Sequence, residues 1–134
     1  MRVWRQDRSG HAGRRADTAQ PARIYLTTAE IVIDEAADEA ATVATGNAVL
    51  AGIAAADAIC ADASGQRYRG PDHRAAANHL ERVTGDRAFG RTWRELIDLK
   101  DAGHYGLRNV SRTNARKALR RAKKLVEEAA SRVR

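Results

Sequence analysis

Aromatic residues and cysteine are scarce in this chain of 134 residues, and both shortages restrict what the protein can be. Aromatic side chains make up 4% of the sequence, so a row of rings on which single-stranded bases stack is poorly supported. The one cysteine, Cys60, excludes an internal disulfide, and it lies in an apolar run where we expect it to be a small buried side chain. The sequence therefore predicts a reducing compartment, and we expect a cytoplasmic protein.

Motifs of several enzyme classes are also missing. Ser64, Ser111 and Ser131 stand in no nucleophile-elbow sequence. His73 and His79 lack the i, i+4 spacing of a helical ligand pair, so we predict no metal and no cofactor. The N-terminal segment has no apolar region of a secretory signal, and no stretch approaches the roughly 20 apolar residues of a membrane span. We therefore expect no membrane association.

What remains is the composition of a helical bundle. The sequence is 43% hydrophobic, with abundant alanine, two prolines and little alternation of β-branched residues, so we expect no strands. The length suits one domain. We predict an all-α fold, an up-and-down bundle of about five helices over residues 21–134, preceded by a flexible basic arm over residues 1–20.

Helical periodicity predicts the five helices over residues 21–42, 47–63, 72–83, 89–102 and 111–134. In the first we expect a buried stripe made of Ile24, Ile31, Ala36, Ala40 and Val43. In the second, Gly52 and six neighbouring alanines should let the backbone approach other helices closely. The last helix has the clearest amphipathic pattern, and Ser111 is its predicted N-cap. Its expected buried stripe consists of Ala115, Ala118, Leu119, Ala122, Leu125, Val126 and Ala129.

The net charge of +7 is concentrated at the two ends of the sequence. Residues 1–23 carry +4, residues 24–104 carry −5, and residues 105–134 carry +8. A field of this kind attracts a polyanion, of which RNA and DNA are the commonest, although a basic helix face also serves solubility alone. The predicted nucleic-acid-binding residues share the polar face of the last helix or precede it: Arg108, Arg112, Arg116, Arg120, Lys123 and Lys124.

A second candidate site lies at the end of the fourth predicted helix. Lys100 and His104 are one turn apart and can address one target, and Tyr105 follows between two glycines. Histidine can act as a general acid or base near neutral pH, while a cation stabilises developing negative charge on a phosphate. His104, Lys100 and Tyr105 are therefore the candidate catalytic residues, with Arg108 close enough to contribute charge. The alternative is a structural helix end.

Several segments together resemble HEPN-domain proteins. The run from Asn47 to Cys60 is similar to the second helix of that domain, and the loop Gly70-Pro-Asp-His73 is similar to the entry into its third helix. The order Leu99-Lys100, His104-Tyr105 and an alanine-rich basic last helix resembles its closing half. The resemblance covers about residues 22–132. It implies an up-and-down helical bundle that forms a homodimer.

The resemblance also implies a function. Active HEPN domains are metal-independent ribonucleases in which Arg-x(4–6)-His motifs meet across a dimer cleft and the RNA 2′-hydroxyl attacks. Other members have lost the motif and bind or scaffold, often in toxin–antitoxin or phage-defence systems. At the corresponding place this chain has Lys100-x3-His104, which is shorter and lacks the bidentate guanidinium of arginine. The motif spacing is found instead in Arg67-x5-His73 and Arg74-x4-His79.

Three functions follow as hypotheses. The first is a HEPN-like, nucleic-acid-associated accessory or toxin-type component of a defence system with weak or no catalysis. The second is a metal-independent endoribonuclease that acts at a dimer cleft, using His73 or His79. The third is a non-enzymatic module that docks onto a cognate protein partner, for which the acidic face of the first helix gives support.

Overall fold

The computed structural model describes residues 4–6, 12–64, 66–68, 73–104 and 110–132, and the side chains of residues 19–61, 75–99 and 110–132. Five helices dominate this part of the chain and confirm the predicted all-α bundle. The elements in chain order are β1 (Trp4–Gln6), α1 (Ala12–Val32), α2 (Ala40–Ser64), β2 (Gln66–Tyr68), α3 (His73–Thr84), α4 (Arg87–His104) and α5 (Arg112–Arg132).

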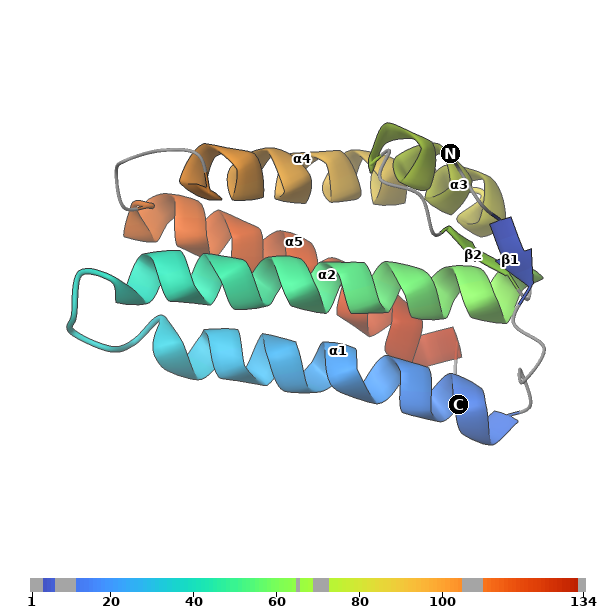
Figure 1. Ribbon diagram of the computed structural model, residues 1–134, viewed down its shortest axis with the longest axis horizontal. Coiled ribbons are helices and arrows are strands. Elements are labelled where there is room, and N and C mark those ends of the chain that lie inside the picture. The colour runs from blue at the N-terminus through green and yellow to red at the C-terminus, as the bar shows by residue number, and fades with distance from the viewer. Residues whose placement is uncertain (1–3, 7–11, 65, 69–72, 105–109, 133–134) are drawn as a thin grey trace.

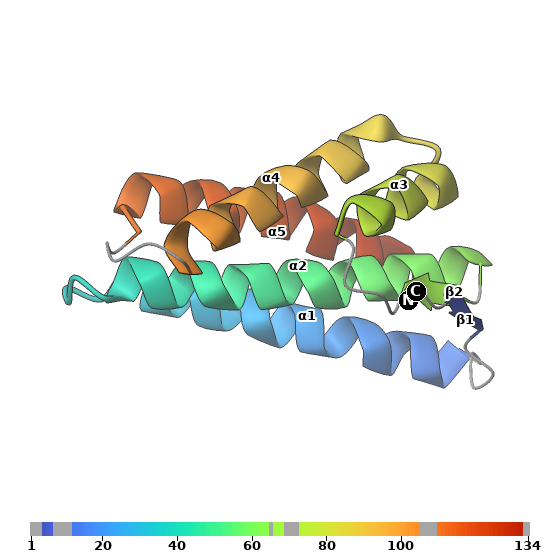
Figure 2. The same ribbon diagram turned by 45° about the horizontal axis from the view of Figure 1, so that its top comes forward.

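The central element is α2, which contacts each of the other four helices. The helices α1 and α2 form a long antiparallel pair, α5 packs along both, and the α3–α4 pair covers the remaining side (Figures 1 and 2). A turn at Gly85, whose φ of +69° suits glycine, joins α3 to α4. The short antiparallel strands β1 and β2 lie against the C-terminal end of α2, with Trp4 opposite Tyr68.

The core is built largely from alanine, with a few large aliphatic residues between the helices. The largest fully buried side chains are Ile59, Leu80, Leu96 and Leu125. A Cβ atom at Gly52 of α2 would collide with the side chain of Leu96 and contact that of Leu125 at 3.6 Å. The close approach of α2 to α4 therefore depends on glycine at this position, as the small-residue run predicts.

The predicted helix over residues 21–42 is wrong, because two helices share that segment. The helix α1 ends at Val32, and α2 begins at Ala40. Between them the backbone carbonyls of Ile33, Glu35 and Ala37 accept hydrogen bonds from Arg112 of α5, at 2.7, 2.7 and 3.2 Å. Because this turn is stabilised by a side chain that is distant in the sequence, the residues of the turn alone do not predict it.

The predicted buried stripe of the first helix is also mostly wrong. Exposed fractions are 57% for Ile24, 63% for Ile31 and 49% for Val43, and Ala36 is exposed as well, whereas Ala40 is buried. The buried face of α1 carries mainly alanine instead, because the backbones of α1 and α2 lie close together. Its members are Ala19, Ala22, Leu26 and Ala29.

The segment expected to be an arm, residues 1–20, contributes to the fold. The strand β1 pairs with β2, which corrects the expectation of no strands. The helix α1 begins at Ala12 and continues through Pro21, which was predicted to open it. Ala19 and Ala22 on either side of Pro21 are buried in the core, and this packing keeps the helix continuous despite the missing proline N–H.

The helices α3, α4 and α5 match their predictions to within two residues at each end, whereas α2 begins at Ala40, seven residues before its predicted start. The helix α5 buries Ala115, Ala118, Ala122, Leu125, Val126 and Ala129, while Leu119 is half-buried. The Ser111 hydroxyl accepts a hydrogen bond from the Asn114 N–H at 3.1 Å, which confirms the predicted N-cap. In α4, the side chains of Trp93, Leu96 and Ile97 are buried.

Candidate functional site

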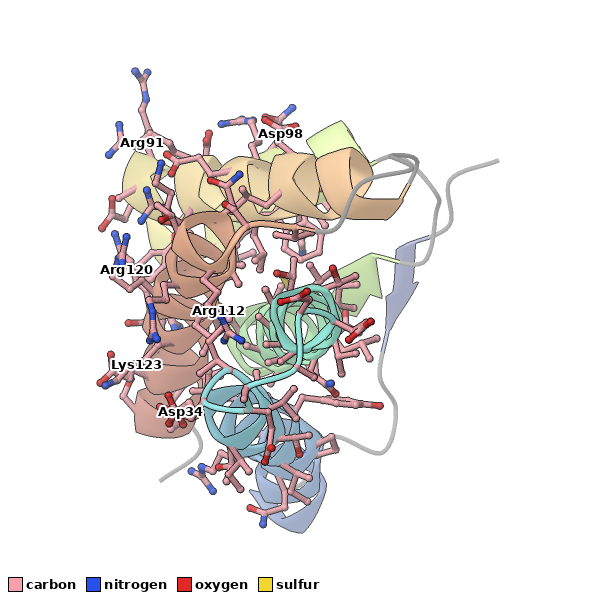
Figure 3. All side chains as sticks on the ribbon, turned by 90° about the vertical axis from the view of Figure 1, so that its left-hand side faces the viewer. Asp34, Arg91, Asp98, Arg112, Arg120 and Lys123 are labelled. Carbon is pink, nitrogen blue, oxygen red and sulfur yellow. The ribbon has the colours of Figure 1, made fainter. Side chains whose placement is uncertain are left out.

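Exposed cationic side chains gather on the outer face of α5 and the adjoining part of α4, and we call this set the cationic face. Its members are Arg91, Arg116, Lys117, Arg120, Lys123 and Lys124, all of which are exposed. In Figure 3, Arg91, Arg120 and Lys123 project on the same side of the molecule, away from α2. The face follows from the sequence because the opposite side of α5 is apolar and buried.

Two contacts fix the position of α4 beside α5. The Arg121 guanidinium pairs with the Glu95 carboxylate, and the Lys124 Nζ lies 5.3 Å from the centroid of the Phe89 ring. Arg91 lies between Phe89 and Glu95 on α4, so it borders the exposed cations of α5. Sequence reasoning missed Arg91 and Lys117. Arg91 could have been found from its i, i+4 spacing to Arg87, which places both arginines on one side of α4.

The cationic face is suited to negative charge that arrives from outside the protein. From Arg116 to Lys124 the helix rises about 12 Å. Over this length a nucleic-acid duplex presents about seven phosphate charges. No described aromatic side chain is exposed, since Phe89 and Tyr25 are half-buried and Trp93 is buried. The chemistry available here is therefore contact with phosphates, without stacking on bases.

Arg112, predicted among the nucleic-acid-binding residues, has a different position. Its guanidinium reaches between α5, α1 and α2, where it donates to three backbone carbonyls of the α1–α2 turn (Figure 3). Its side chain is half-buried. Arg112 thus links the start of α5 to the α1–α2 turn and does not belong to the cationic face.

His79, from the predicted Arg74-x4-His79 motif, is buried in α3 with 5% of its surface exposed. The Arg82 guanidinium, one turn away, donates to His79 Nδ1 at 3.2 Å. Burial lowers the pKa of His79, and the positive charge of Arg82 lowers it further. His79 is therefore a neutral core residue at pH 7, and its described partner is Arg82.

Cys60 is the one free thiol among the described residues, and it is buried. Burial, together with the nearby Asp57 carboxylate, raises the pKa of the Cys60 thiol to about 12. The thiol is therefore protonated at neutral pH and is a poor nucleophile. Its expected role as a small core residue agrees with this environment.

The candidate catalytic group falls largely outside the described part of the protein. The backbones of Lys100 and His104 belong to the last turns of α4, as the spacing predicts. Their side chains, together with Tyr105 and Arg108, lie outside the described residues. The same holds for the side chains of three residues in the alternative motifs, namely Arg67, His73 and Arg74.

Within the described residues, no group of three or more His, Cys, Asp or Glu side chains is placed to hold a metal ion. One described stretch, Ala40–Ala61 of α2, is long and apolar enough to cross a membrane, contrary to the sequence-based expectation that no stretch is. Because 56% of its most apolar window is buried inside the bundle, it has the character of a core helix. No family model, curated protein or solved structure matches this chain.

Proposed function

We propose that this protein binds the phosphate backbone of nucleic acid through the cationic face. The observation that carries the proposal is the set of six exposed cations on α5 and α4, five of which lie between Arg116 and Lys124. Together with the resemblance to HEPN domains, it supports a nucleic-acid-associated accessory role of the kind found in defence and toxin systems.

The residue types support backbone contact that does not depend on base sequence. Lysine and arginine contacts to phosphate fix position on the strand but carry no sequence information. Sequence readout of single strands needs unstacked bases and aromatic platforms, and the described side chains offer none on this face. We therefore expect double-stranded RNA and DNA of unrelated sequences to bind with similar affinity.

We also propose that hydrolysis of RNA is weak or absent. Among the described side chains the one histidine, His79, is buried and has Arg82 as its neighbour, which does not suit attack on an external phosphate. The place where HEPN domains carry Arg-x(4–6)-His is occupied here by Lys100-x3-His104. RNA cleavage by the purified protein that His104→Ala abolishes, with folding intact, would contradict this part of the proposal.

The binding test is fluorescence polarisation with labelled 20-base-pair RNA and DNA duplexes across a series of salt concentrations. We expect log Kd to rise linearly with log salt, because binding releases condensed counterions. The variant carrying Arg120→Gln and Lys124→Gln should lower the magnitude of that slope by about 1.8, since each phosphate contact contributes about 0.9.

The matched control is Arg23→Gln. Arg23 is exposed on α1, where its guanidinium donates a hydrogen bond to Gln20 of the same helix at 3.2 Å. Replacing it with glutamine removes the same type of charge as Arg120→Gln does. It should leave the slope within error of the parent protein. No binding at low salt, or equal slopes for the double variant and the control, would refute the proposal. Different affinities for the RNA and DNA duplexes would contradict the expected similarity and would show which polymer the face prefers.

A further inference from the structure

The outer side of α2 carries exposed apolar residues near its N-terminal end. Exposed fractions are 49% for Val43 and 44% for Leu50, and Gly46 between them is exposed as well. These positions are three and four residues apart, so helical spacing places all three on one side of α2. From Ala40 to Ala56 the sequence has no charged residue. We call Val43, Gly46 and Leu50 the α2 stripe.

The packing of the described chain does not explain why residue 46 is a glycine. A Cβ atom built on Gly46 meets nothing within 4 Å, and Gly46 does not share the positive φ of Gly85. Glycine inside a helix is destabilising relative to alanine, so an open position of this kind favours alanine. The glycine lies one turn from the exposed Leu50 side chain. A small and a large residue side by side on one helix fit each other reciprocally when a second copy approaches.

The α2 stripe and the cationic face lie on opposite sides of the bundle. A Cβ atom at Gly52 would lie 3.6 Å from the Leu125 side chain, so these positions mark the sides on which α2 and α5 face each other. Leu50 lies about 160° around α2 from Gly52, and Arg116 lies about 180° around α5 from Leu125. The views agree, since α5 passes behind α2 in Figure 1 and the labelled cations point away from α2 in Figure 3.

We propose that two copies of this chain associate through their α2 stripes and that the dimer bridges two nucleic-acid duplexes. The two α2 helices run antiparallel about a two-fold axis, with Leu50 of each copy over Gly46 of the other and Val43 against Ile53. Because the cationic faces of this dimer point apart, each is open to a separate duplex. The shared cleft implied by the resemblance to HEPN domains would instead bring one nucleic acid between the copies. The bridging rests on the proposed function of the cationic face, whereas the association does not.

A second copy suits the α2 stripe for reasons of charge and fit. Each copy has a net charge of +7, so repulsion is least where the contact is uncharged and the cationic faces are furthest apart. The large residue and the small residue are each used twice in a two-fold contact, which a different partner would not require. From Val43 to Ile53 the helix rises about 15 Å, a short contact compared with those of permanent dimers. We therefore expect the association to be reversible.

Sedimentation equilibrium of the full chain without nucleic acid tests the association. We expect a monomer–dimer equilibrium that added salt favours, because salt screens the repulsion between two copies of like net charge. Leu50→Glu should weaken the dimer at least tenfold, since the two-fold axis brings the two new carboxylates close together. The matched control is Ile31→Glu, because Ile31 is 63% exposed on α1, and it should leave the equilibrium unchanged.

Substitutions at Gly46 separate a fitted contact from general stickiness. Gly46→Leu should keep the melting temperature of the parent protein or raise it, because the position is open. It adds apolar surface, yet it should weaken the dimer at least tenfold, since Leu50 of the other copy loses its space. The swapped pair, Gly46→Leu with Leu50→Gly, should restore the dimer, because each leucine again faces a glycine of the other copy.

Capture of one duplex by another tests the bridging. A biotinylated DNA duplex on beads should retain a fluorescent second duplex when the parent protein is present. Leu50→Glu should abolish this capture but leave the affinity for a single duplex, measured by fluorescence polarisation, within about twofold, because Leu50 lies opposite the cationic face. Ile31→Glu should behave as the parent protein does.

The outcomes that contradict the proposal are distinct. A monomer at every concentration, equal weakening by Leu50→Glu and Ile31→Glu, or a stronger dimer with Gly46→Leu would refute association through the α2 stripe. Sedimentation with phosphatidylcholine vesicles that Leu50→Glu abolishes would assign the stripe to a membrane. A dimer that binds single duplexes but captures no second one would refute the bridging alone. A dimer that binds no duplex would refute the proposed function and the bridging with it.

Discussion

The α1–α2 pair and the α4–α5 side of this bundle use their exposed surfaces in opposite ways. From Ile24 to Gln66 the chain has no basic residue, and the exposed surface of α1 and α2 combines carboxylates with large aliphatic side chains. The outer side of α5 and of neighbouring α4 carries six exposed cations and no exposed large hydrophobic residue among the described ones. Both surfaces cover one shared core, so the core does not determine their chemistry.

The contrast shows that a net charge of one sign can conceal separate surfaces of opposite sign. The net charge of +7 suggests a uniformly basic surface, yet the cationic face and the exposed carboxylates of the α1–α2 turn lie on different elements. The packing around Leu125 and the guanidinium of Arg112 are two of the described side-chain features that join the pair α1–α2 to α5. Changing either tests how the two regions are joined.

The largest expected effect comes from a substitution in the packing contact between α2 and α5. Leu125 is fully buried and lies against Gly52, so Leu125→Ala removes packing between the two regions and leaves a cavity. We expect the free energy of unfolding to fall by about 2–5 kcal/mol, measured by urea denaturation. Leu119→Ala on the same helix is the control, and it should cost less because Leu119 is half-buried. Equal losses for the two variants would contradict the described packing.

A smaller loss is expected when the hydrogen bonds across the regions are removed. Arg112→Met keeps much of the side-chain volume but leaves the carbonyls of Ile33, Glu35 and Ala37 without their donor. The free energy of unfolding should fall by about 1–2 kcal/mol, since part of the site is open to water. Amide exchange should also accelerate in the turn between α1 and α2 before it does so elsewhere.

Arg116→Met serves as the comparison for Arg112→Met. Arg116 lies one turn later on α5 and is exposed. Its replacement by methionine should change the free energy of unfolding by no more than about 0.5 kcal/mol. If the two substitutions destabilise the protein equally, Arg112 has no special role in the turn.

The smallest expected effect is a decline in the free energy of unfolding at acidic pH. The pKa of His79 in the folded protein is lowered by burial and by Arg82, so the unfolded chain binds the proton more readily. The stabilisation associated with neutral His79 is complete above its unfolded pKa of about 6.5 and declines as the pH falls below that value. Urea denaturation from pH 7.5 to pH 5 should show this decline, and His79→Gln should flatten it. An identical pH dependence in the variant would disprove the contribution.

Much of the fold could be predicted from the sequence where one helix face is consistently apolar. The helix α5 shows this best, because Ala115, Ala118, Ala122 and Leu125 repeat at helical spacing and Ser111 caps the start. Four members of the cationic face, Arg116, Arg120, Lys123 and Lys124, were predicted from the other side of the same helix. Here local pattern and tertiary packing agree, so periodicity was sufficient.

The α1–α2 region could not be predicted in the same way. Its helices are apolar on more than one side, so Ile24 and Ile31 were expected inside when alanine and leucine occupy the core. The turn between the helices depends on Arg112, which is far away in the sequence. The pairing of β1 with β2 is likewise a long-range contact. Arg91 was missed because its place beside α5 depends on how two helices pack.

The close approach at Gly52 has a consequence for how this sequence can change. A methyl group there would collide with the Leu96 side chain, so the residue sizes at positions 52 and 96 are linked across two helices. Gly52→Ala alone is unfavourable, but trimming Leu96 to valine makes room for the added carbon. A library randomised at both positions should therefore return small–large and large–small combinations more often than either site alone would suggest, and the surviving pairs would report the distance between α2 and α4.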